Sequence, residues 1–358
     1  MNFGRRSVHQ FAAGFNTGDA ISNEMSSLRT LFRKMGYSSE IFAENTGPGT
    51  GALVKKHKAY SPRKRDILIY HHSIHSEVLE FVQETKNPKI LVYHNVTPYH
   101  YFERYDLKLT YLLKKGREEL EVLRDEFDFV LAVSEYNKKE LNDLGFKNVE
   151  VLPITYQLPQ VKSPIENPPP IDESSKIPKF LFVGRITPNK KQDDLIRFAH
   201  IYSKLFGPDF QLFIVGFSSK ELYLYREELE RMLDFYKLRQ NVIITDFLSD
   251  EEVRRMYRSC DLFLSMSEHE GFCVPLLEAM VYKIPILAYD AGAVSETLDG
   301  AGILFKEKRM ETVAELAHKL ATDSNLRNDI LDTQEHRLRN FSTVNPESIM
   351  RPILAKLA

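Results

Sequence analysis

Two carboxylates in the second half of the sequence have the spacing of a site that could bind a phosphorylated sugar. Glu270 and Glu278 bracket the stretch EGFCVPLLE, which follows an apolar run, Asp261–Ser267. Gly271 allows a tight turn, and Pro275 fits the first turn of a helix, where its missing N–H would have no partner. Free N–H groups at a helix N-terminus favour a phosphate, and the carboxylates can accept hydrogen bonds from sugar hydroxyls. The alternative is that Glu270 is only a solvated turn residue and that Glu278 is only a surface residue of the helix.

A basic loop in the same half could supply the positive charge that a diphosphate needs. The apolar run KFLFVG ends at Gly184, and the following RITPNKK contains Arg185 and Lys190. A planar guanidinium and a compact ammonium group together suit the oxygens of a diphosphate. The alternative is a solvated basic loop, but the predicted anion site in the same half favours the diphosphate clamp. Lys191 is predicted to be a solvated neighbour.

The first half offers weaker signals. Gly14 and Gly18 flank a turn between a predicted strand and a helix that begins near Asp19, and glycines there let the backbone approach a ligand. The segment HHSIH contains three histidines. His71 and His72 are adjacent and therefore point in different directions, and no Cys or carboxylate pattern accompanies them, so we predict no metal site. A polar wall beside an acceptor is the other interpretation of this segment.

Composition limits the function classes. The chain has 358 residues, 43% of them hydrophobic and 27% charged, which is typical of about two soluble domains. The formal net charge of -2 argues against nucleic-acid binding. Two cysteines fit a reducing cytoplasm, and the N-terminal segment lacks the apolar core of a signal peptide. No run of about 18 apolar residues occurs, so any membrane contact is expected to be peripheral.

The alternation of apolar runs and helical segments predicts an α/β fold. In the second half, KFLFVG, FQLFIVG, NVIITDF, DLFLSMS and IPILAYD are separated by helical patterns, which is typical of a parallel sheet covered on both faces. The first half repeats the pattern less clearly. We therefore expect two Rossmann-like doubly wound domains facing a central cleft, at residues 1–160 and 179–340. A proline-rich linker is expected at 161–178, and a C-terminal helix at 341–358 is expected to pack across the domain junction.

Three separated motifs then carry a family resemblance. VGRITPNKKQDDLI, FLSDEEVRRMYRSCDLFLSMSEHEGFCVPLLEAM and IPILAYDAGAVSETL resemble glycosyltransferase family 4, the retaining GT-B enzymes. The first half is similar to the mannosyltransferase-like branch through VHQFAAGFNTGDAIS, DILIYHHS, LVYHNVTP and VSEYNKKEL. Two positions depart from the family's pattern, because Cys273 and Lys283 stand where relatives often carry Gly.

The resemblance implies roles for matching residues. Arg185 and Lys190 would bind the donor diphosphate and stabilise the charge that develops as the glycosidic bond breaks. Glu270 would hold hydroxyls of the transferred sugar, and Glu278 would accept hydrogen bonds from the ribose. The resemblance also implies that the N–H groups around Phe272, Cys273 and Val274 meet the sugar or a phosphate. The loop of Gly14 and Gly18 would face the donor phosphates and the acceptor, and His94 would lie near the transferred sugar. Ordinary packing of a buried histidine is the alternative for His94.

These expectations combine into a retaining, metal-independent hexosyltransferase without a cofactor. It would move a hexose, with mannose from GDP-mannose favoured, to a saccharide or lipid-linked saccharide acceptor in polysaccharide biosynthesis. A UDP-sugar-dependent enzyme such as a glucosyltransferase, or a non-catalytic GT-B scaffold, is the alternative. The aromatic and basic segment at 97–124 either contacts the inner membrane face or forms an ordinary helix surface.

Overall fold

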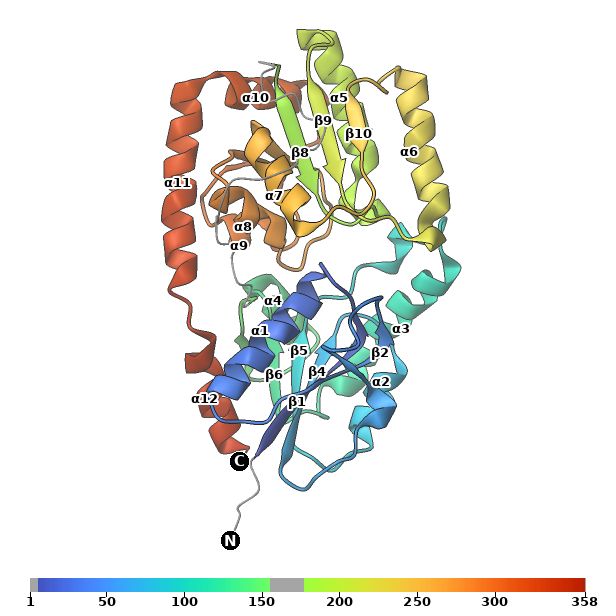
Figure 1. Ribbon diagram of the computed structural model, residues 1–358, viewed down its shortest axis with the longest axis vertical. Helices are drawn as coiled ribbons and strands as arrows, with labels where there is room; N and C mark the ends of the chain where they lie inside the picture. Colours follow the sequence, from blue (N-terminus) through green and yellow to red (C-terminus); the bar gives the residue numbers. More distant parts are fainter. Residues whose placement is uncertain (1–5, 155–176, 358) are drawn as a thin grey trace. The chain divides into compact units, whose positions relative to one another are not determined.

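The chain divides into two compact α/β units, each built around a parallel sheet (Figure 1). The computed structural model describes residues 6–154 and 177–357. Within these ranges the first unit contains residues 6–100, 108–154 and 344–357, and the second contains 101–107 and 177–343. The predicted linker at 161–178 lies outside the described residues except for Ile177 and Pro178.

The first unit has a seven-stranded sheet in the order β3-β2-β1-β4-β5-β6-β7, with every pairing parallel. Its strands are β1 (Ser7–Phe15), β2 (Ile41–Thr46), β3 (Lys55–Lys56), β4 (Asp66–His72), β5 (Lys89–Tyr93), β6 (Phe129–Ala132) and β7 (Val149–Val151). Its helices are α1 (Ala20–Lys34), α2 (Glu77–Gln83), α3 (Leu107–Leu123), α4 (Glu135–Asp143) and α12 (Pro346–Lys356).

The second unit has a six-stranded parallel sheet in the order β10-β9-β8-β11-β12-β13. Its strands are β8 (Lys179–Val183), β9 (Gln211–Val215), β10 (Val242–Ile244), β11 (Leu262–Ser265), β12 (Ile286–Tyr289) and β13 (Ile303–Phe305). Its helices are α5 (Gln192–Phe206), α6 (Tyr223–Tyr236), α7 (Asp250–Ser259), α8 (Val274–Val281), α9 (Val294–Leu298), α10 (Met310–Thr322) and α11 (Ser324–Ser342).

In each sheet the chain first adds strands on one side of the unit's first strand and then continues on its other side. In the second unit the chain moves outward from β8 to β9 and β10, and then returns to place β11 on the other side of β8. In the first unit the same reversal separates β1 from β4. Loops that leave neighbouring strands in opposite directions open a crevice at the carboxyl ends, where open α/β sheets bind ligands. The loops after β8 and β11 therefore mark the place to look for a site in the second unit.

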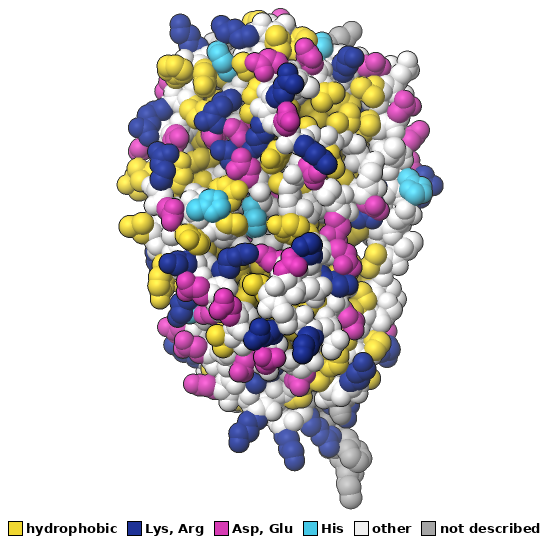
Figure 2. All heavy atoms as spheres, turned by 180° about the vertical axis from the view of Figure 1, so that it is seen from behind, with side chains coloured by type: hydrophobic (Ala, Val, Ile, Leu, Met, Phe, Trp, Pro, Cys, Tyr) yellow, Lys and Arg dark blue, Asp and Glu magenta, His cyan; other side chains and the backbone are white. Residues whose placement is uncertain are grey.

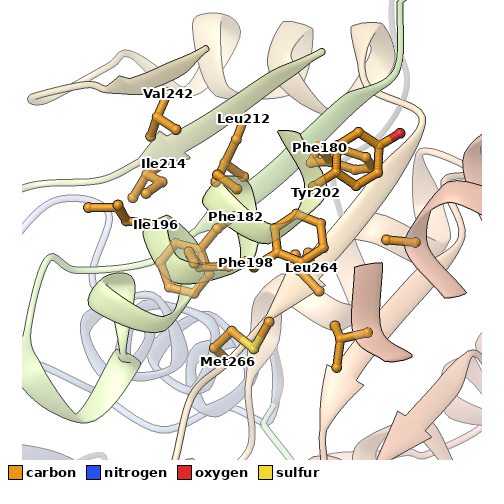
Figure 3. Packing of buried hydrophobic residues seen from close by; sticks show 14 of the residues in the cluster. Phe180, Phe182, Ile196, Phe198, Tyr202, Leu212, Ile214, Val242, Leu264 and Met266 are labelled. Carbon is orange, nitrogen blue, oxygen red and sulfur yellow. The ribbon is translucent and has the colours of Figure 1, made fainter. Parts of the chain in front are cut away.

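Alternating side chains of the strands bury both faces of the second sheet. Phe180, Leu212 and Leu264 point to the side of α5, α6 and α10, where they meet the aromatic side chains of α5 (Figure 3). Phe263 of the opposite face stacks on Tyr257 of α7, with ring centroids 6.1 Å apart. Such burial on both faces explains why these strands read as continuous apolar runs in the sequence. The predicted pair of Rossmann-like parallel-sheet domains is confirmed by this topology.

The surface carries both signs of charge. On the face shown in Figure 2, Lys and Arg side chains lie interspersed with Asp and Glu over most of the surface, in keeping with the small net charge. Within residues 6–154 and 177–357, no helix combines the length and the apolar character needed to cross a membrane. The C-terminal helix α12 buries Met350, Ile353 and Leu354, and its residues group with the first unit.

Candidate anion-binding and sugar-binding site

An ion pair joins the loops that follow β8 and β11. The ammonium nitrogen of Lys190 lies 2.6 Å from Oε2 of Glu270, and the two side chains are only 17% and 7% exposed. Lys190 ends a short 3₁₀ turn, Pro188–Lys190, and Glu270 lies five residues beyond the end of β11. The switch point of the sheet thus brings together a predicted phosphate-binding cation and a predicted sugar-binding carboxylate.

Main-chain hydrogen bonds hold these two loops against each other. The N–H of Glu268 donates to the carbonyl of Asn189 over 2.9 Å, and the side-chain amide of Asn189 donates to the carbonyl of His269 over 3.4 Å. On the other side, the N–H of Ala293 donates to the carbonyl of Glu270 over 2.9 Å. A Cβ atom at Gly292 would lie 2.3 Å from that carbonyl, and φ is +60° there, so only glycine fits. The Glu270 backbone is therefore braced from both sides.

The N-terminus of α8 presents unpaired main-chain donors beside Glu270. Within the described part of the chain, the N–H groups of Phe272, Cys273 and Val274 donate no hydrogen bond. Pro275 lies in the first turn of the helix, as the sequence predicted. Three successive donors with the positive end of the helix dipole form the anion-binding arrangement expected from the EGFCVPLLE stretch.

Cys273 and Lys283, the two positions that depart from the family's glycine pattern, both have left-handed backbone conformations. Cys273 precedes α8 with φ of +72°, and Lys283 follows it with φ of +56°. Glycine adopts this conformation without strain, whereas other residues are disfavoured in it. The backbone at both ends of α8 thus has the left-handed conformation that glycine favours, although this chain has Cys273 and Lys283 there.

The Cys273 thiol is part of the interior of this site. It is 8% exposed, and burial together with the nearby Glu270 carboxylate holds its pKa well above the usual range. Because the thiol stays protonated, it can donate a hydrogen bond to Glu270. Lys190 and Cys273 therefore contact the same carboxylate.

Glu278 is held in place by a tyrosine of α7. The hydroxyl of Tyr257 donates to Oε2 of Glu278 over 2.9 Å. Tyr257 is 1% exposed, whereas Glu278 is half-buried. A half-buried carboxylate with one oriented oxygen suits hydrogen bonding to vicinal hydroxyls.

Arg185 lies on the same basic loop and is exposed. Its guanidinium forms no ion pair with any described carboxylate, while its carbonyl accepts a hydrogen bond from Gln192 over 3.0 Å. A Cβ atom at Gly216 would lie 1.9 Å from the carbonyl of Gly184, so glycine at the end of β9 allows the close approach of the chain that leads to Arg185. Arg185 is available for an incoming anion.

Lys191 was expected to be a solvated neighbour, and this prediction is wrong. Its ammonium group lies 2.9 Å from Asp193 and 3.9 Å from Asp194, and its side chain is 22% exposed. Desolvation opposes the charge, but the two carboxylates outweigh it and raise the pKa of Lys191. Lys308 also binds Asp194, and it binds Glu268 as well, each over 2.7 Å. These pairs anchor the start of α5.

The predicted glycines of the first unit have different environments. Gly14 lies inside β1, whereas Gly18 lies in the following turn with φ of +78°, and a Cβ atom there would meet no other atom within 4 Å. Asp19 caps α1 by accepting a hydrogen bond from the N–H of Ser22. Gly18 is therefore required by backbone conformation, and Gly14 is not.

His94 follows β5 and turns its side chain into the first unit. Its imidazole is 2% exposed, and Nε2 lies 2.8 Å from Nδ1 of His71. His72 points elsewhere and lies 2.7 Å from the carbonyl of Gly116, which confirms that the adjacent histidines diverge. The main-chain carbonyl of His94 accepts no hydrogen bond from the described residues.

Sequence reasoning missed several residues that shape these loops: Asn189, Gly216, Tyr257, Gly292 and Lys308. Only the glycines left a local signal, because each follows a predicted strand. No group of three or more His, Cys, Asp and Glu in residues 6–154 and 177–357 is arranged to hold a metal ion.

Comparison with known proteins agrees with this geometry. Residues 165–337 match the family model described as "Glycosyl transferases group 1". The chain is 29% identical to O-antigen biosynthesis glycosyltransferase WbnH of Escherichia coli over 178 residues, which are 49% of this chain and 46% of that protein. It is 27% identical to the serotype-specific mannosyltransferase WbdA of Escherichia coli over 225 residues, which are 62% of this chain and 25% of that protein. The aligned regions thus span less than half the length of these curated relatives.

The fold is shared over nearly the whole chain. Sucrose-phosphate synthase from Thermosynechococcus elongatus superposes with a TM-score of 0.72 and 16% identity, over 98% of this chain and 99% of that one. The two parallel-sheet domains are those of the GT-B fold. The matched region contains the Lys190–Glu270 pair, the N-terminus of α8 and Glu278. The match to the glycosyl transferases group 1 model thus covers the part of the chain that forms this candidate site.

Proposed function

We propose that this protein is a retaining glycosyltransferase that moves a hexose from a nucleotide-sugar donor to a saccharide or lipid-linked saccharide acceptor. The observation that carries the proposal is the contact of Lys190 with Glu270 beside the unpaired N–H groups of Phe272, Cys273 and Val274. One loop cluster thereby offers positive charge for a diphosphate and a carboxylate for sugar hydroxyls. The family match of residues 165–337 supports the same activity.

Each residue has a separate part in donor binding. Arg185 and Lys190 bind the diphosphate, and they stabilise the negative charge that grows on it as the bond to the sugar breaks. The N–H groups at the start of α8 meet a phosphate or sugar oxygen. Glu270 accepts hydrogen bonds from hydroxyls of the transferred hexose, and Glu278 accepts them from the ribose.

Positive charge from the protein replaces the charge that a divalent ion supplies in other sugar transferases, so we propose metal-independent transfer. The acceptor hydroxyl attacks the anomeric carbon on the face that the diphosphate leaves. Its proton passes to an oxygen of the departing phosphate, and the configuration is retained. His94 and Gly18, at the strand ends of the first unit, are the residues that we assign to the sugar and acceptor side.

We further propose GDP-mannose as the donor, on the basis of the similarity to mannosyltransferase WbdA and of the motifs in the first half. Two free, buried cysteines suit a cytoplasmic enzyme, where nucleotide sugars would be the co-substrate and no other cofactor is required. The acceptor belongs to the saccharides of surface polysaccharide assembly, in line with the relative WbnH.

Calorimetric titration of GDP, UDP, ADP and their hexose conjugates tests the donor site. We expect the wild type to prefer GDP and GDP-mannose by at least about tenfold, or about 1.4 kcal/mol. Glu278→Ala should weaken binding, because it removes the carboxylate assigned to the ribose. Glu315→Ala, an exposed position on α10, is the matched control. Preference for UDP would replace the donor assignment, and binding to none of these compounds would refute the transferase proposal.

Transfer is then measured with the preferred donor and a panel of saccharide and lipid-linked acceptors. Nuclear magnetic resonance of the product should show the anomeric configuration of the donor. Turnover should persist in a chelator of divalent ions. An inverted product or complete loss of turnover in the chelator would contradict the proposed mechanism.

A further inference from the structure

A chain of four buried side chains runs through the first unit behind the end of β5. Nε2 of His94 lies 2.8 Å from Nδ1 of His71, and Nε2 of His71 lies 3.0 Å from Oε1 of Gln10. At the other end, Nδ1 of His94 faces Oε2 of Glu24 at 3.5 Å. The four residues come from α1, β1, β4 and the residue after β5, so three sheet segments and one helix meet at this chain.

Gln10 determines the direction of the hydrogen bonds. Its Nε2 donates to the carbonyl of Met25 over 2.8 Å, so its Oε1 is the acceptor for His71. His71 must then carry its proton on Nε2, which leaves Nδ1 as an acceptor for Nε2–H of His94. A neutral His94 consequently has a lone pair on Nδ1, the atom that faces Glu24.

Burial favours the neutral forms of these groups. Glu24 is fully buried, and desolvation raises its pKa to about 8. Desolvation lowers the pKa of His71 to about 3, and desolvation followed by repulsion from His71 and His72 lowers that of His94 well below its usual range. At neutral pH the contact between Glu24 and His94 is therefore one between a carboxylic acid and a neutral imidazole.

Among the described residues, Glu24 has no other hydrogen-bond or ion-pair partner. Neither of its carboxyl oxygens forms a hydrogen bond with a described residue, and no charged group shifts its pKa. A buried polar group left in this state destabilises the fold, so it is retained in a core only against that penalty. The Nδ1 lone pair of His94 lies 3.5 Å from Oε2 and can accept its proton, since a small movement of either side chain completes the hydrogen bond.

We propose that Glu24 is a positioning residue, which donates a hydrogen bond to Nδ1 of His94 as a neutral carboxylic acid and so fixes the orientation of this imidazole. The chain Glu24–His94–His71–Gln10 then holds the end of β5 rigid, with the His94 carbonyl presented at the ligand-binding edge of the sheet. This inference deepens the proposed function, on which its catalytic consequence rests. The hydrogen bond to Nδ1 of His94 does not depend on that function.

The groups that could influence this proton are few. His71 of β4 contacts His94, His72 turns away from it but would repel its charged form, and Gln10 of β1 closes the chain. Glu24 is the one carboxyl group of the described residues that lies within 4 Å of a His94 ring nitrogen. A carboxylate formed at Glu24 above its pKa could no longer donate, and the chain would lose its first hydrogen bond.

Nitrogen-15 spectra of histidine-labelled protein test the tautomers directly. The wild type and Glu24→Gln should show His71 and His94 as neutral Nε2–H tautomers at pH 7, because the glutamine amide can still donate to Nδ1. Glu24→Met, which has similar size but no donor, should keep this tautomer and move the Nδ1 resonance of His94 to that of a nitrogen that accepts no hydrogen bond. Glu121→Gln, at an exposed position of α3, controls for the loss of a carboxyl group.

Steady-state kinetics with the donor provide the second readout. Glu24→Met should lower kcat by about fivefold to tenfold, the effect of one lost hydrogen bond, while Glu24→Gln stays close to the wild type at pH 7. Activity of the wild type should fall above pH about 8, where Glu24 loses its proton, and this fall should be absent in Glu24→Gln. If Glu24 had only a structural role, the fall in activity above pH about 8 would be the same in Glu24→Gln as in the wild type.

Two results would overturn the proposal. If Glu24→Met keeps the wild-type Nδ1 resonance of His94, Glu24 donates no hydrogen bond to the imidazole and does not orient it. If Glu24→Gln is as impaired as Glu24→Met, Glu24 acts as a carboxylate rather than as a donor. Should the wild type transfer no sugar at all, the proposed function fails, and the nitrogen-15 spectra alone still decide the role of Glu24.

Discussion

The ammonium group of Lys190 lies 2.6 Å from Oε2 of Glu270, although the two residues are 80 positions apart in the sequence. The pair connects the loops after β8 and β11, the two strands that flank the switch point. Its charges compensate each other before a ligand binds, and a diphosphate would share Lys190 with Glu270. The pair therefore serves both the stability of the loops and the proposed chemistry.

Replacing Lys190 with Gln should lower kcat about 100-fold, the usual effect of losing one electrostatic stabiliser of the transition state. It should also reduce the free energy of unfolding by about 1–3 kcal/mol, because the 6%-exposed Glu270 loses its counter-ion. Kinetics and urea denaturation measure the two effects. Lys204→Gln, at an exposed position of α5, should change neither. Wild-type kinetics of Lys190→Gln would exclude a role in catalysis.

Tyr257→Phe should weaken nucleotide binding about threefold to fivefold, because it removes the hydroxyl that orients Glu278. Tyr282→Phe is a closely matched control. The Tyr282 ring stacks on Tyr257 with centroids 5.2 Å apart, but its buried hydroxyl has no hydrogen-bond partner among the described residues. Calorimetric titration of GDP should thus distinguish the two variants. Equal affinities would show that Tyr257 does not act through Glu278.

Lys283→Gly should raise the free energy of unfolding by about 0.5–1 kcal/mol, since glycine relieves the left-handed strain at this exposed position. The helix α8 ends here in a Schellman motif, in which Ile284 N–H donates to the carbonyl of Ala279 and Lys283 N–H to that of Met280. Lys204→Gly, inside α5, should instead destabilise by about 1 kcal/mol. Thermal denaturation should show a higher stability for Lys283→Gly and a lower one for Lys204→Gly. Destabilisation by Lys283→Gly would contradict the argument.

Stability should fall as pH rises from about 6.5 to 8 because of Glu24. Its pKa is raised to about 8 in the folded protein, so the native state keeps a proton that the unfolded state has released, and the slope is about 1.4 kcal/mol per pH unit. His71 and His72 act in the opposite direction. Their pKa values are lowered to about 3 and about 4, so their contributions are complete above the unfolded pKa and are lost as pH falls below about 6.5. Below pH 6.5 the two histidines together outweigh Glu24, so urea denaturation should show a maximum near pH 6.5.

Glu24→Gln isolates the alkaline side of that profile. It should remove most of the loss between pH 6.5 and 8, and it should also steepen the rise between about pH 4.5 and 6.5, where Glu24 opposes the histidines. Glu121→Gln should reproduce the wild-type profile. A profile of Glu24→Gln that still falls by the same amount would assign the loss to another group.

Much of the fold was predictable because its signals are local. Continuous apolar runs identified β8 to β12 of the second unit, since burial on both sheet faces leaves few polar positions. The short edge strand β13 was not predicted. Pro275 and the turn before it marked the start of α8, because proline and glycine restrict or free the backbone wherever they occur. Asp19 likewise marked the start of α1 as its cap.

The partners of the site residues were not predictable, because they are distant in the sequence. Lys190 and Lys191 are adjacent and chemically alike, yet one contacts Glu270 and the other Asp193. Lys190 ends a 3₁₀ turn and Lys191 precedes α5, so the backbone directs their side chains apart. No local sequence pattern predicts this difference. Tyr257 gave no signal either, because a tyrosine at a helical core position normally only packs.

The sequence by itself determined the parallel α/β architecture, the basic loop after β8 and the start of α8 at Pro275, because hydrophobic periodicity and backbone preference act over a few residues. Only the tertiary structure decided that Lys190 is paired with Glu270, that Tyr257 holds Glu278, and that His94 turns inward to His71. These contacts depend on strand order, which places residues from separate βα units beside one another at the carboxyl edge of a sheet.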